Sequence, residues 1–200
     1  MGKTKLFVYG ASGHGKVVAD IAELCGYEVA GFIDDHAADT ITYELFRQSS
    51  PSAHVALGIG NNDARAAVYH RLKENGTKVT TLVHPSATIA RTARIGEGTV
   101  VMANAVINPD ALIERGCIIN SASVIEHDNV IDQFVHVSPG AHLAGNVTVN
   151  EFSHIGIGAC AIQGIRIGSH CTIGAGSTVL GDIPDNSTAV GCPAKVIKHG

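Results

Sequence analysis

The sequence predicts two parts of different architecture: a small α/β domain of Rossmann-like type over residues 1–84 and a parallel β-helix over residues 85–200. Three observations carry this prediction. Strand-like and helix-like segments alternate in the first part, a glycine-rich turn joins its first strand to its first helix, and aliphatic residues recur at every sixth position through the second part. Alternation of strands and helices is typical of a parallel sheet covered by helices. A fixed six-residue repeat is typical of a β-helix.

The first part contains four segments with the character of short buried strands. Between them, residues 16–24 and 63–74 carry apolar side chains at helical spacing, and Gly26 and Gly76 are suited to end these helices. Residues 35–52 follow neither period, so we expect a loop with at most one helical turn. The four expected strands are Lys5–Tyr9, Glu28–Ile33, His54–Ile59 and Val79–Val83.

The second part is organised by a six-residue repeat that begins at Ile89. Sixteen positions follow this spacing as far as Val179, and all are Ile, Leu or Val except Ala161. In a β-helix each repeat is a short strand and a turn, and the aliphatic side chain points inward. Its burial contributes about 1.5–3 kcal/mol before chain ordering is subtracted. An antiparallel sandwich is the alternative, because its period of two divides six. It does not explain why aliphatic residues avoid the intervening positions so consistently.

Composition narrows the classes of function. The formal net charge of −4 gives no general attraction to nucleic acid or to an anionic membrane surface. No stretch approaches the ~18 consecutive apolar residues of a membrane span, and the first residues lack the apolar core of a signal peptide. The five cysteines form no CxxC pair, which favours a reducing compartment. We therefore expect a cytoplasmic protein that binds neither nucleic acid nor membrane.

Six short motifs together resemble one family. They are YGASGHG, FIDD, GIGNN, SVIEHD, HVSPGA and the closing GCPAK. The chain resembles the left-handed β-helix acyltransferases, in which three repeats form a coil and residues 18 apart stack. Within them it is most similar to the sialic acid O-acetyltransferase and UDP-4-amino-sugar N-acetyltransferase subfamily, where a Rossmann-like domain precedes the β-helix.

This resemblance implies a reaction and an assembly. It implies transfer of acetyl from acetyl-CoA to the 4-amino group of a UDP-linked amino sugar, as in bacillosamine-type glycan biosynthesis. A β-helix with one apolar outer face is expected to form a homotrimer. We expect the base and the acetyl-CoA pocket of each active site to come from neighbouring chains.

The glycine-rich turn at residues 10–15 predicts an anion site. It follows a strand and opens a helix, so backbone amides and the helix N-terminus favour a phosphate near Ser12, Gly13 and His14. The turn lacks the central glycine of a dinucleotide fingerprint, so a nucleoside diphosphate fits better than NAD. Further polar residues end the second and third strands, at the same edge of the sheet. The resemblance implies that the turn and these residues hold the UDP group; they are Asp34, Asp35, Gly60, Asn61 and Asn62.

His127 is the candidate general base. An amine attacks a thioester only when it is unprotonated, and imidazole has an ordinary pKa near neutrality, where a general base is most efficient. A carboxylate can orient the ring and stabilise its protonated form. The resemblance implies this role for Asp128, and Glu126 is the alternative. No cysteine or serine is flanked like an activated nucleophile, so we expect direct transfer rather than an acyl-enzyme.

The other site residues come from the resemblance. It implies that His136 contacts acetyl-CoA, and Asn120 matches an active-site asparagine, with an internal asparagine turn as the equal alternative. His136 and His154 are 18 residues apart and should stack, but no further ligand completes a metal site, so no metal is expected. We expect His154 at the surface. The residues expected along the acetyl-CoA path are Ile157, Gly176, Gly191, Pro193 and Ala194.

Four alternatives compete with this reading of the function. The acceptor could be a hydroxyl group, as in a sialic acid or other sugar O-acetyltransferase, or the substrate could be a GDP-linked amino sugar. A non-catalytic scaffold that senses nucleotide sugars is a third alternative. A γ-class carbonic anhydrase shares the β-helix, but it needs three zinc-binding histidines and has no nucleotide domain.

Overall fold

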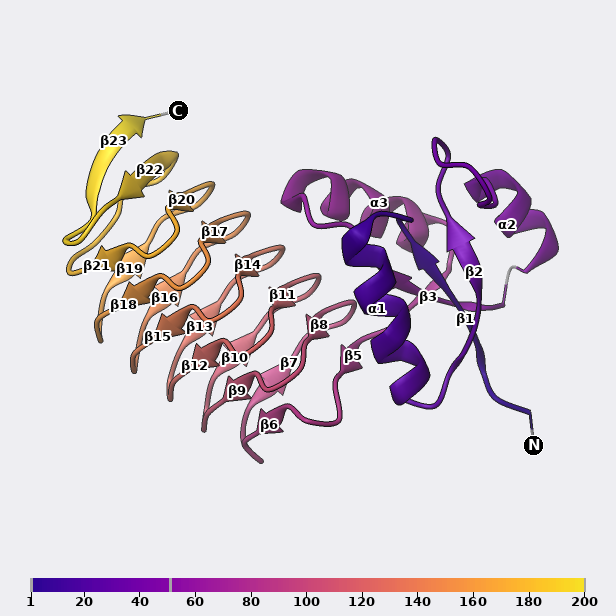
Figure 1. The fold of residues 1–200 in the computed structure, drawn as a ribbon, viewed down its shortest axis with the longest axis horizontal. Helices are drawn as coiled ribbons and strands as arrows, with labels where there is room; N and C mark the ends of the chain where they lie inside the picture. The colour runs from indigo at the N-terminus through magenta and orange to yellow at the C-terminus, as the bar shows by residue number, and fades with distance from the viewer. Residues whose placement is uncertain (1, 51, 200) are drawn as a thin grey trace.

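The computed structural model describes residues 2–50 and 52–199, which form an α/β domain beside a stack of coils (Figure 1). Three helices lie in the α/β domain: α1 (Gly13–Leu24), α2 (Tyr43–Ser49) and α3 (Asn62–Glu74). Among the described residues no helix is long and apolar enough to cross a membrane. The strands of the α/β domain are β1 (Lys5–Tyr9), β2 (Glu28–Ile33), β3 (His54–Leu57) and β4 (Lys78–Val79).

The sheet of the α/β domain is parallel, in the order β2-β1-β3-β4. Helix α1 packs on one side through Val18, Ile21 and Ala22, while α2 and α3 cover the other. The segment expected to be a loop with at most one helical turn contains the two-turn helix α2, so its helical content was underestimated. Thr42 caps this helix, since its side-chain oxygen accepts a hydrogen bond from the amide of Leu45.

The β-helix has three faces of stacked parallel strands, and each coil takes 18 residues. Ile113, for example, pairs with Ile95 below and Ile131 above. The inward residues from Ile107 to Val179 form one continuous buried core, which confirms the six-residue reading. Face 1 holds β5 (Leu82–Val83), β8 (Val100–Val101), β11 (Ile118–Ile119), β14 (His136–Val137), β17 (His154–Ile155), β20 (Thr172–Ile173), β22 (Ser187–Val190) and the antiparallel β23 (Lys195–His199).

The other two faces follow the same stacking. Face 2 holds β6 (Thr88–Ile89), β9 (Val106–Ile107), β12 (Val124–Ile125), β15 (His142–Leu143), β18 (Cys160–Ala161) and β21 (Thr178–Val179). Face 3 holds β7 (Arg94–Ile95), β10 (Leu112–Ile113), β13 (Val130–Ile131), β16 (Thr148–Val149) and β19 (Arg166–Ile167).

The segment expected to be one strand over residues 79–83 is divided between the two parts. Strand β4 completes the sheet of the α/β domain, whereas β5 opens face 1 by pairing with β8. The chain changes from one architecture to the other within three residues, which leaves little freedom for the domains to move apart.

The α/β domain packs on face 1. The outward residues of the first three coils on this face, Leu82, Val100 and Ile118, are buried against α1. This apolar outer surface is therefore covered by the chain's own domain, so it is not available to hold a trimer together. A buried arginine fastens the other side of the contact, because Arg65 of α3 donates to the carbonyls of Gly116 and Phe134.

Candidate active site

Three edges run along the β-helix where its faces meet, and they separate the expected site residues. Edge 1-2 joins face 1 to face 2 and carries residues 120–123, 138–141, 156–159 and 174–177. Edge 2-3 joins face 2 to face 3 and carries residues 90–93, 108–111, 126–129 and 144–147. Within one chain, His127 lies on edge 2-3, whereas Asn120, Ile157 and Gly176 lie on edge 1-2. The expected residues thus form two half-sites on different edges.

The half-site on edge 2-3 is a histidine–aspartate pair. Nδ1 of His127 lies 2.7 Å from a carboxylate oxygen of Asp128, and both side chains are exposed. This hydrogen bond raises the pKa of His127 above its ordinary value. Asp128 adopts a left-handed backbone conformation, with φ of 60°, that aspartate tolerates better than most residues. Asp128, rather than Glu126, is the acid that contacts the ring.

The ring of His127 lies over a glycine of the next coil. A methyl group on Gly145 would come within 2.5 Å of Cε1 and Nε2 of the imidazole. The turn itself is held by buried Asn129, whose side chain donates to the carbonyls of Glu126 and Ala144 and accepts from the amide of Val147. Because Asp128 takes Nδ1, the neutral ring presents Nε2 as its basic nitrogen, in open space beside the glycine.

The half-site on edge 1-2 begins with an asparagine–histidine pair. Asn120 donates through its side-chain nitrogen to Nε2 of His136 at 3.0 Å and accepts from the amide of Ser121. The backbone of Gly60, at the end of β3, also bonds to His136. Burial lowers the pKa of His136 to about 3, so the ring is neutral and its tautomer is set by these two partners. Asn120 therefore faces outward and is not an internal asparagine turn.

Residues expected along the acetyl-CoA path lie farther along edge 1-2. Ile157 is 56% exposed, and its carbonyl accepts a hydrogen bond from the amide of Gly176 in the next coil. The closing segment returns to this end of the β-helix, where the amide of Gly191 donates to Ser177 and the amide of Ala194 donates to the carbonyl of Thr178. Pro193 lies between these two anchored residues. An exposed aliphatic side chain beside backbone turns suits the apolar arm of a thioester cofactor.

The crevice expected for the nucleotide lies at the carboxyl ends of β1, β2 and β3. A pocket of about 370 Å³ there is lined mainly by apolar surface, with Tyr9, Ile59 and Arg71 among its walls. Asp34 accepts from the amides of Ala11 and His36, and these bonds lower its pKa. Its carboxylate therefore also shapes the glycine-rich turn.

Asp35 is the more heavily engaged of the two acids. It accepts from the amide of Tyr43, from Arg71 and from the hydroxyl of Tyr9, and the amide bond contributes most to its lowered pKa. The guanidinium of Arg71 also stacks 3.9 Å from the ring of Tyr43. A cation, a carboxylate and a phenol thus converge at one end of an apolar pocket.

The glycine-rich turn lies beside face 1. Ser12 and Gly13 are exposed where α1 begins, as a phosphate site requires, and His14 is half-buried. Nε2 of His14 is buried without a hydrogen-bond partner among the described residues, and burial lowers the pKa of this histidine to about 4. His14 and His136 are close enough to influence each other electrostatically. The nucleotide crevice and edge 1-2 therefore belong to the same half-site.

His154 is not the surface residue that was expected. Its ring stacks on that of His136 at 4.8 Å, and its Nε2 lies 2.7 Å from the hydroxyl of Ser138. It lines a polar pocket of about 250 Å³ between face 1 and the start of α3, together with Gly60 and Asn62. Asn62 also donates to the carbonyl of Phe152, which makes it a tether between the domains.

Sequence reasoning missed the residues that support the site. Arg65 lies on the buried side of α3 with Ala66, Tyr69 and Leu72. A charged residue on this otherwise apolar side could have indicated a buried polar contact. The contact of Gly145 with His127 could have been predicted from the spacing, because Gly145 lies 18 residues after His127 and therefore stacks on it. Asn129 directly follows the His127–Asp128 pair, at a position where neighbouring repeats have small residues.

Comparison with known proteins agrees with this architecture. Residues 5–72 match the family described as PglD N-terminal domain, and residues 92–127 match bacterial transferase hexapeptide repeats. The chain is 39% identical over 108 residues to UDP-N-acetylbacillosamine N-acetyltransferase of Bacillus subtilis (strain 168), a match that covers 48% of this chain and 50% of that protein. The matched segment thus spans about half of this curated relative.

Solved structures match nearly the whole chain. The acetyltransferase domain of PglB from Neisseria gonorrhoeae FA1090, in complex with acetyl coenzyme A, is 41% identical with a TM-score of 0.92 and covers 98% of this chain and 100% of that one. PerB from Caulobacter crescentus, in complex with CoA and GDP-perosamine, is 33% identical with a TM-score of 0.92 and covers 97% of each chain. The β-helix is accordingly left-handed, and the chain belongs to the hexapeptide-repeat acyltransferases, in the subfamily whose β-helix is preceded by a PglD-type domain.

Proposed function

We propose that the protein transfers the acetyl group of acetyl-CoA to the 4-amino group of a UDP-linked amino-deoxy sugar, in bacillosamine-type glycan biosynthesis. The observation that carries this proposal is the His127–Asp128 pair, which leaves a basic imidazole nitrogen exposed beside Gly145. The names of two relatives support the same reaction, since one is an N-acetyltransferase of a UDP-sugar and the other was solved in complex with acetyl coenzyme A.

The reaction follows from these groups. The neutral amine attacks the thioester carbonyl, and Nε2 of His127 accepts the proton that the nitrogen loses. Asp128 holds Nδ1 and stabilises the imidazolium that forms. As the tetrahedral intermediate collapses, the carbon–sulfur bond breaks, and His127 returns its proton to the departing CoA thiolate. The products are the N-acetylated sugar nucleotide and CoA, and the enzyme regains its starting state.

The site is complete only between two copies of the chain. The nucleotide crevice, Asn120 and His136 share one half-site, and His127 lies on a different edge of the same β-helix. We place His127 of one copy against edge 1-2 of the next, around a threefold axis, so that a homotrimer has three equal sites. Acetyl-CoA would run along edge 1-2 past Ile157 and Gly176. We infer a cytoplasmic location, because the reducing cytoplasm would keep the five free cysteines reduced.

A thiol-release assay with acetyl-CoA and a panel of sugars tests this function. UDP-4-amino sugars are expected to be the best acceptors, and His127→Ala is expected to lower kcat by about 100-fold or more with little change in KM for either substrate. His142→Ala is the matched control, because His142 is an exposed histidine of face 2 outside both half-sites. Turnover on free sialic acid but on no 4-amino sugar would contradict the proposal, as would an unaffected His127→Ala variant.

A GDP-linked amino sugar is the second candidate substrate. PerB is 33% identical over 97% of the chain and binds GDP-perosamine. Including GDP-4-amino sugars in the same panel separates the two, because the chemistry at the amine is unchanged and only the nucleotide differs. A kcat/KM at least tenfold higher for GDP than for UDP sugars would reassign the nucleotide while leaving the mechanism in place.

A further inference from the structure

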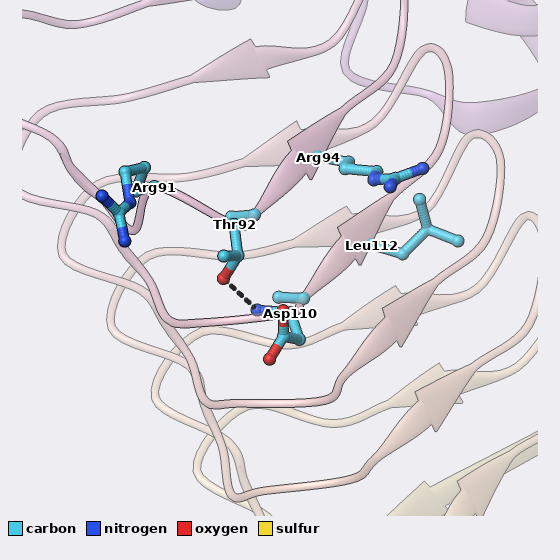
Figure 2. A pocket seen from close by; sticks show the side chains of 7 residues that line it. Arg91, Thr92, Arg94, Asp110 and Leu112 are labelled. Carbon is cyan, nitrogen blue, oxygen red and sulfur yellow. Dashed lines mark hydrogen bonds between the residues drawn. The ribbon is translucent and has the colours of Figure 1, made fainter.

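A pocket of the β-helix lies on edge 2-3 below His127. It has a volume of about 560 Å³ and is formed by the first two coils, with Arg91 and Arg94 at its rim and Leu112 in its wall (Figure 2). The hydroxyl of Thr92 accepts a hydrogen bond from the amide of Asp110 at 3.0 Å, which ties one coil to the next at the floor.

The two arginines of this pocket are unusual among the arginines of the chain. Both are exposed, and within residues 2–50 and 52–199 neither side chain makes a hydrogen bond or ion pair. Arg71 and Arg166, by contrast, each pair with an aspartate of the same chain. With Asp110 present, the pocket carries a formal net charge of about +1 beside an apolar wall, which suits an acidic partner with an apolar side chain.

The geometry of the shared site fixes which surface stands opposite this pocket. Asn120 and His127 belong to the same coil, residues 118–135, and the threefold axis proposed above brings them together between copies when it runs parallel to the β-helix. Such a rotation keeps every coil level with its counterpart. The first two coils of edge 2-3 must then face whatever covers face 1 and edge 1-2 at the same level in the neighbouring copy.

Helix α1 occupies that level. Its N-terminal His14 lies near His136 of the fourth coil, and Cys25, just after its last turn, donates to the carbonyl of Val83 in the first coil. Twelve residues of α-helix span ~18 Å, and the three coil spacings of ~4.8 Å between the first and fourth coils amount to ~14 Å. The helix is therefore long enough to extend from the fourth coil to the first. Its C-terminal half is therefore level with the arginine pocket.

The outward surface of α1 complements the pocket. Asp20 and Glu23 are exposed on this half of the helix, and neither forms an ion pair within the described residues. Leu24 is 53% exposed and Val17 is 44% exposed, one helical repeat apart on the same side as Asp20. Two acids and a leucine thus match two arginines beside Leu112.

We propose that the Arg91–Arg94 pocket receives α1 of a second copy of this chain, with Asp20 and Glu23 on the arginines and Leu24 against Leu112. This inference rests on the shared site proposed above. The contact holds each α/β domain between its own β-helix and the next one, so it sets the spacing between the nucleotide crevice of one copy and His127 of the other.

Charge reversal and its compensation test this contact in the full chain. The double variant Arg91→Glu/Arg94→Glu is expected to raise the dissociation constant of the oligomer at least about tenfold in sedimentation velocity, and so is Asp20→Lys/Glu23→Lys. Combining the four substitutions is expected to restore the dissociation constant to within about threefold of wild type. Arg47→Glu, on the surface of α2, is the control and should change nothing.

The outcomes separate this proposal from the proposed function. An oligomer that resists both reversals, a quadruple variant that stays dissociated, or a monomeric wild-type chain would overturn the contact. Compensation without acetyl transfer by the wild-type protein would instead leave the contact standing and contradict the function. Circular dichroism of each double variant checks that the chain is folded. Because the two double variants alter different domains, the contact can still be tested with one of them if the other misfolds.

Discussion

Removal of the Arg65 side chain tests how the two parts of the chain are joined. The guanidinium is 1% exposed and makes five hydrogen bonds. Two go to carbonyls of the β-helix, and the other three hold the end of β3 and the start of α3. Burial lowers the pKa of Arg65 to about 10, so the group stays charged at neutral pH. Arg65→Met keeps most of the volume and removes every donor.

The structure gives the size of the effect. Removing one partner of a buried, charged hydrogen-bond network costs about 3–5 kcal/mol, because the remaining acceptors stay buried without donors. In a chain of this size each 1 kcal/mol shifts Tm by about 2–4 °C. We therefore expect Arg65→Met to lower Tm by about 6–20 °C. Since these bonds join the two domains, the α/β domain should also begin to unfold before the β-helix.

Scanning calorimetry with urea unfolding followed by near-ultraviolet circular dichroism measures this change. The wild-type chain should unfold in one transition, and Arg65→Met in two, with the tyrosines of the α/β domain reporting the earlier one. Arg47→Met is the control, because Arg47 is an exposed arginine of α2 and its loss should cost less than about 0.5 kcal/mol. A single transition within about 1 kcal/mol of wild type would refute the reasoning.

Three further predictions concern the histidines. The hydrogen bond to Asp128 raises the pKa of His127, so Asp128→Asn should lower that pKa. The acidic limb of the pH profile of kcat/KM should then move to lower pH while kcat falls, and a limb that does not move would contradict a functional His127–Asp128 pair. Gly145→Ala should displace the ring and lower kcat about 10–100-fold with the fold intact, whereas Gly181→Ala, two coils farther along the same edge with no atom near its added methyl, should be neutral in the same assay. Burial lowers the pKa of His136 to about 3, so between pH ~6.5 and that value only the unfolded chain takes up this proton. His136 should therefore contribute a loss of about 1.4 kcal/mol of stability per pH unit as the pH falls toward ~4, in addition to the contribution of buried His14, and a His136→Asn variant with the same pH slope of Tm would argue against it.

The repeat made the β-helix predictable in detail. Its period fixes which side chains point inward, and the stacking of residues 18 apart follows from three repeats per coil. The α/β domain was predictable in its strands and two long helices, because each has a clear period. Helix α2 was missed since it has only seven residues and is held by two aromatic side chains in the core, a tertiary contact without a local pattern.

The residues of the candidate site could be proposed from the sequence. The motif around His127 suggested a base with a neighbouring acid, and the strand ends suggested the edge of the sheet where a pocket lies. Asn120 and His127, only seven residues apart, lie on different edges of the β-helix, as a six-residue repeat with three repeats per coil implies. That separation arises because each repeat turns the chain onto a new face. The sequence alone does not show whether the apolar outward residues of face 1 contact another chain or the α/β domain of the same chain. The packing shows that α1 covers them.

The proposed mechanism requires that each active site joins His127 of one copy to the half-site on edge 1-2 of the next copy. Mixing two inactive variants tests it: His127→Ala, and Asn120→Ala/His136→Ala. If a trimer forms from equal amounts at random and each site draws on two neighbouring chains, about a quarter of all sites are free of substitutions, so the mixture should regain about a quarter of wild-type activity. If the mixture shows no more activity than the two variants measured separately, both groups act within one chain and the shared site is contradicted.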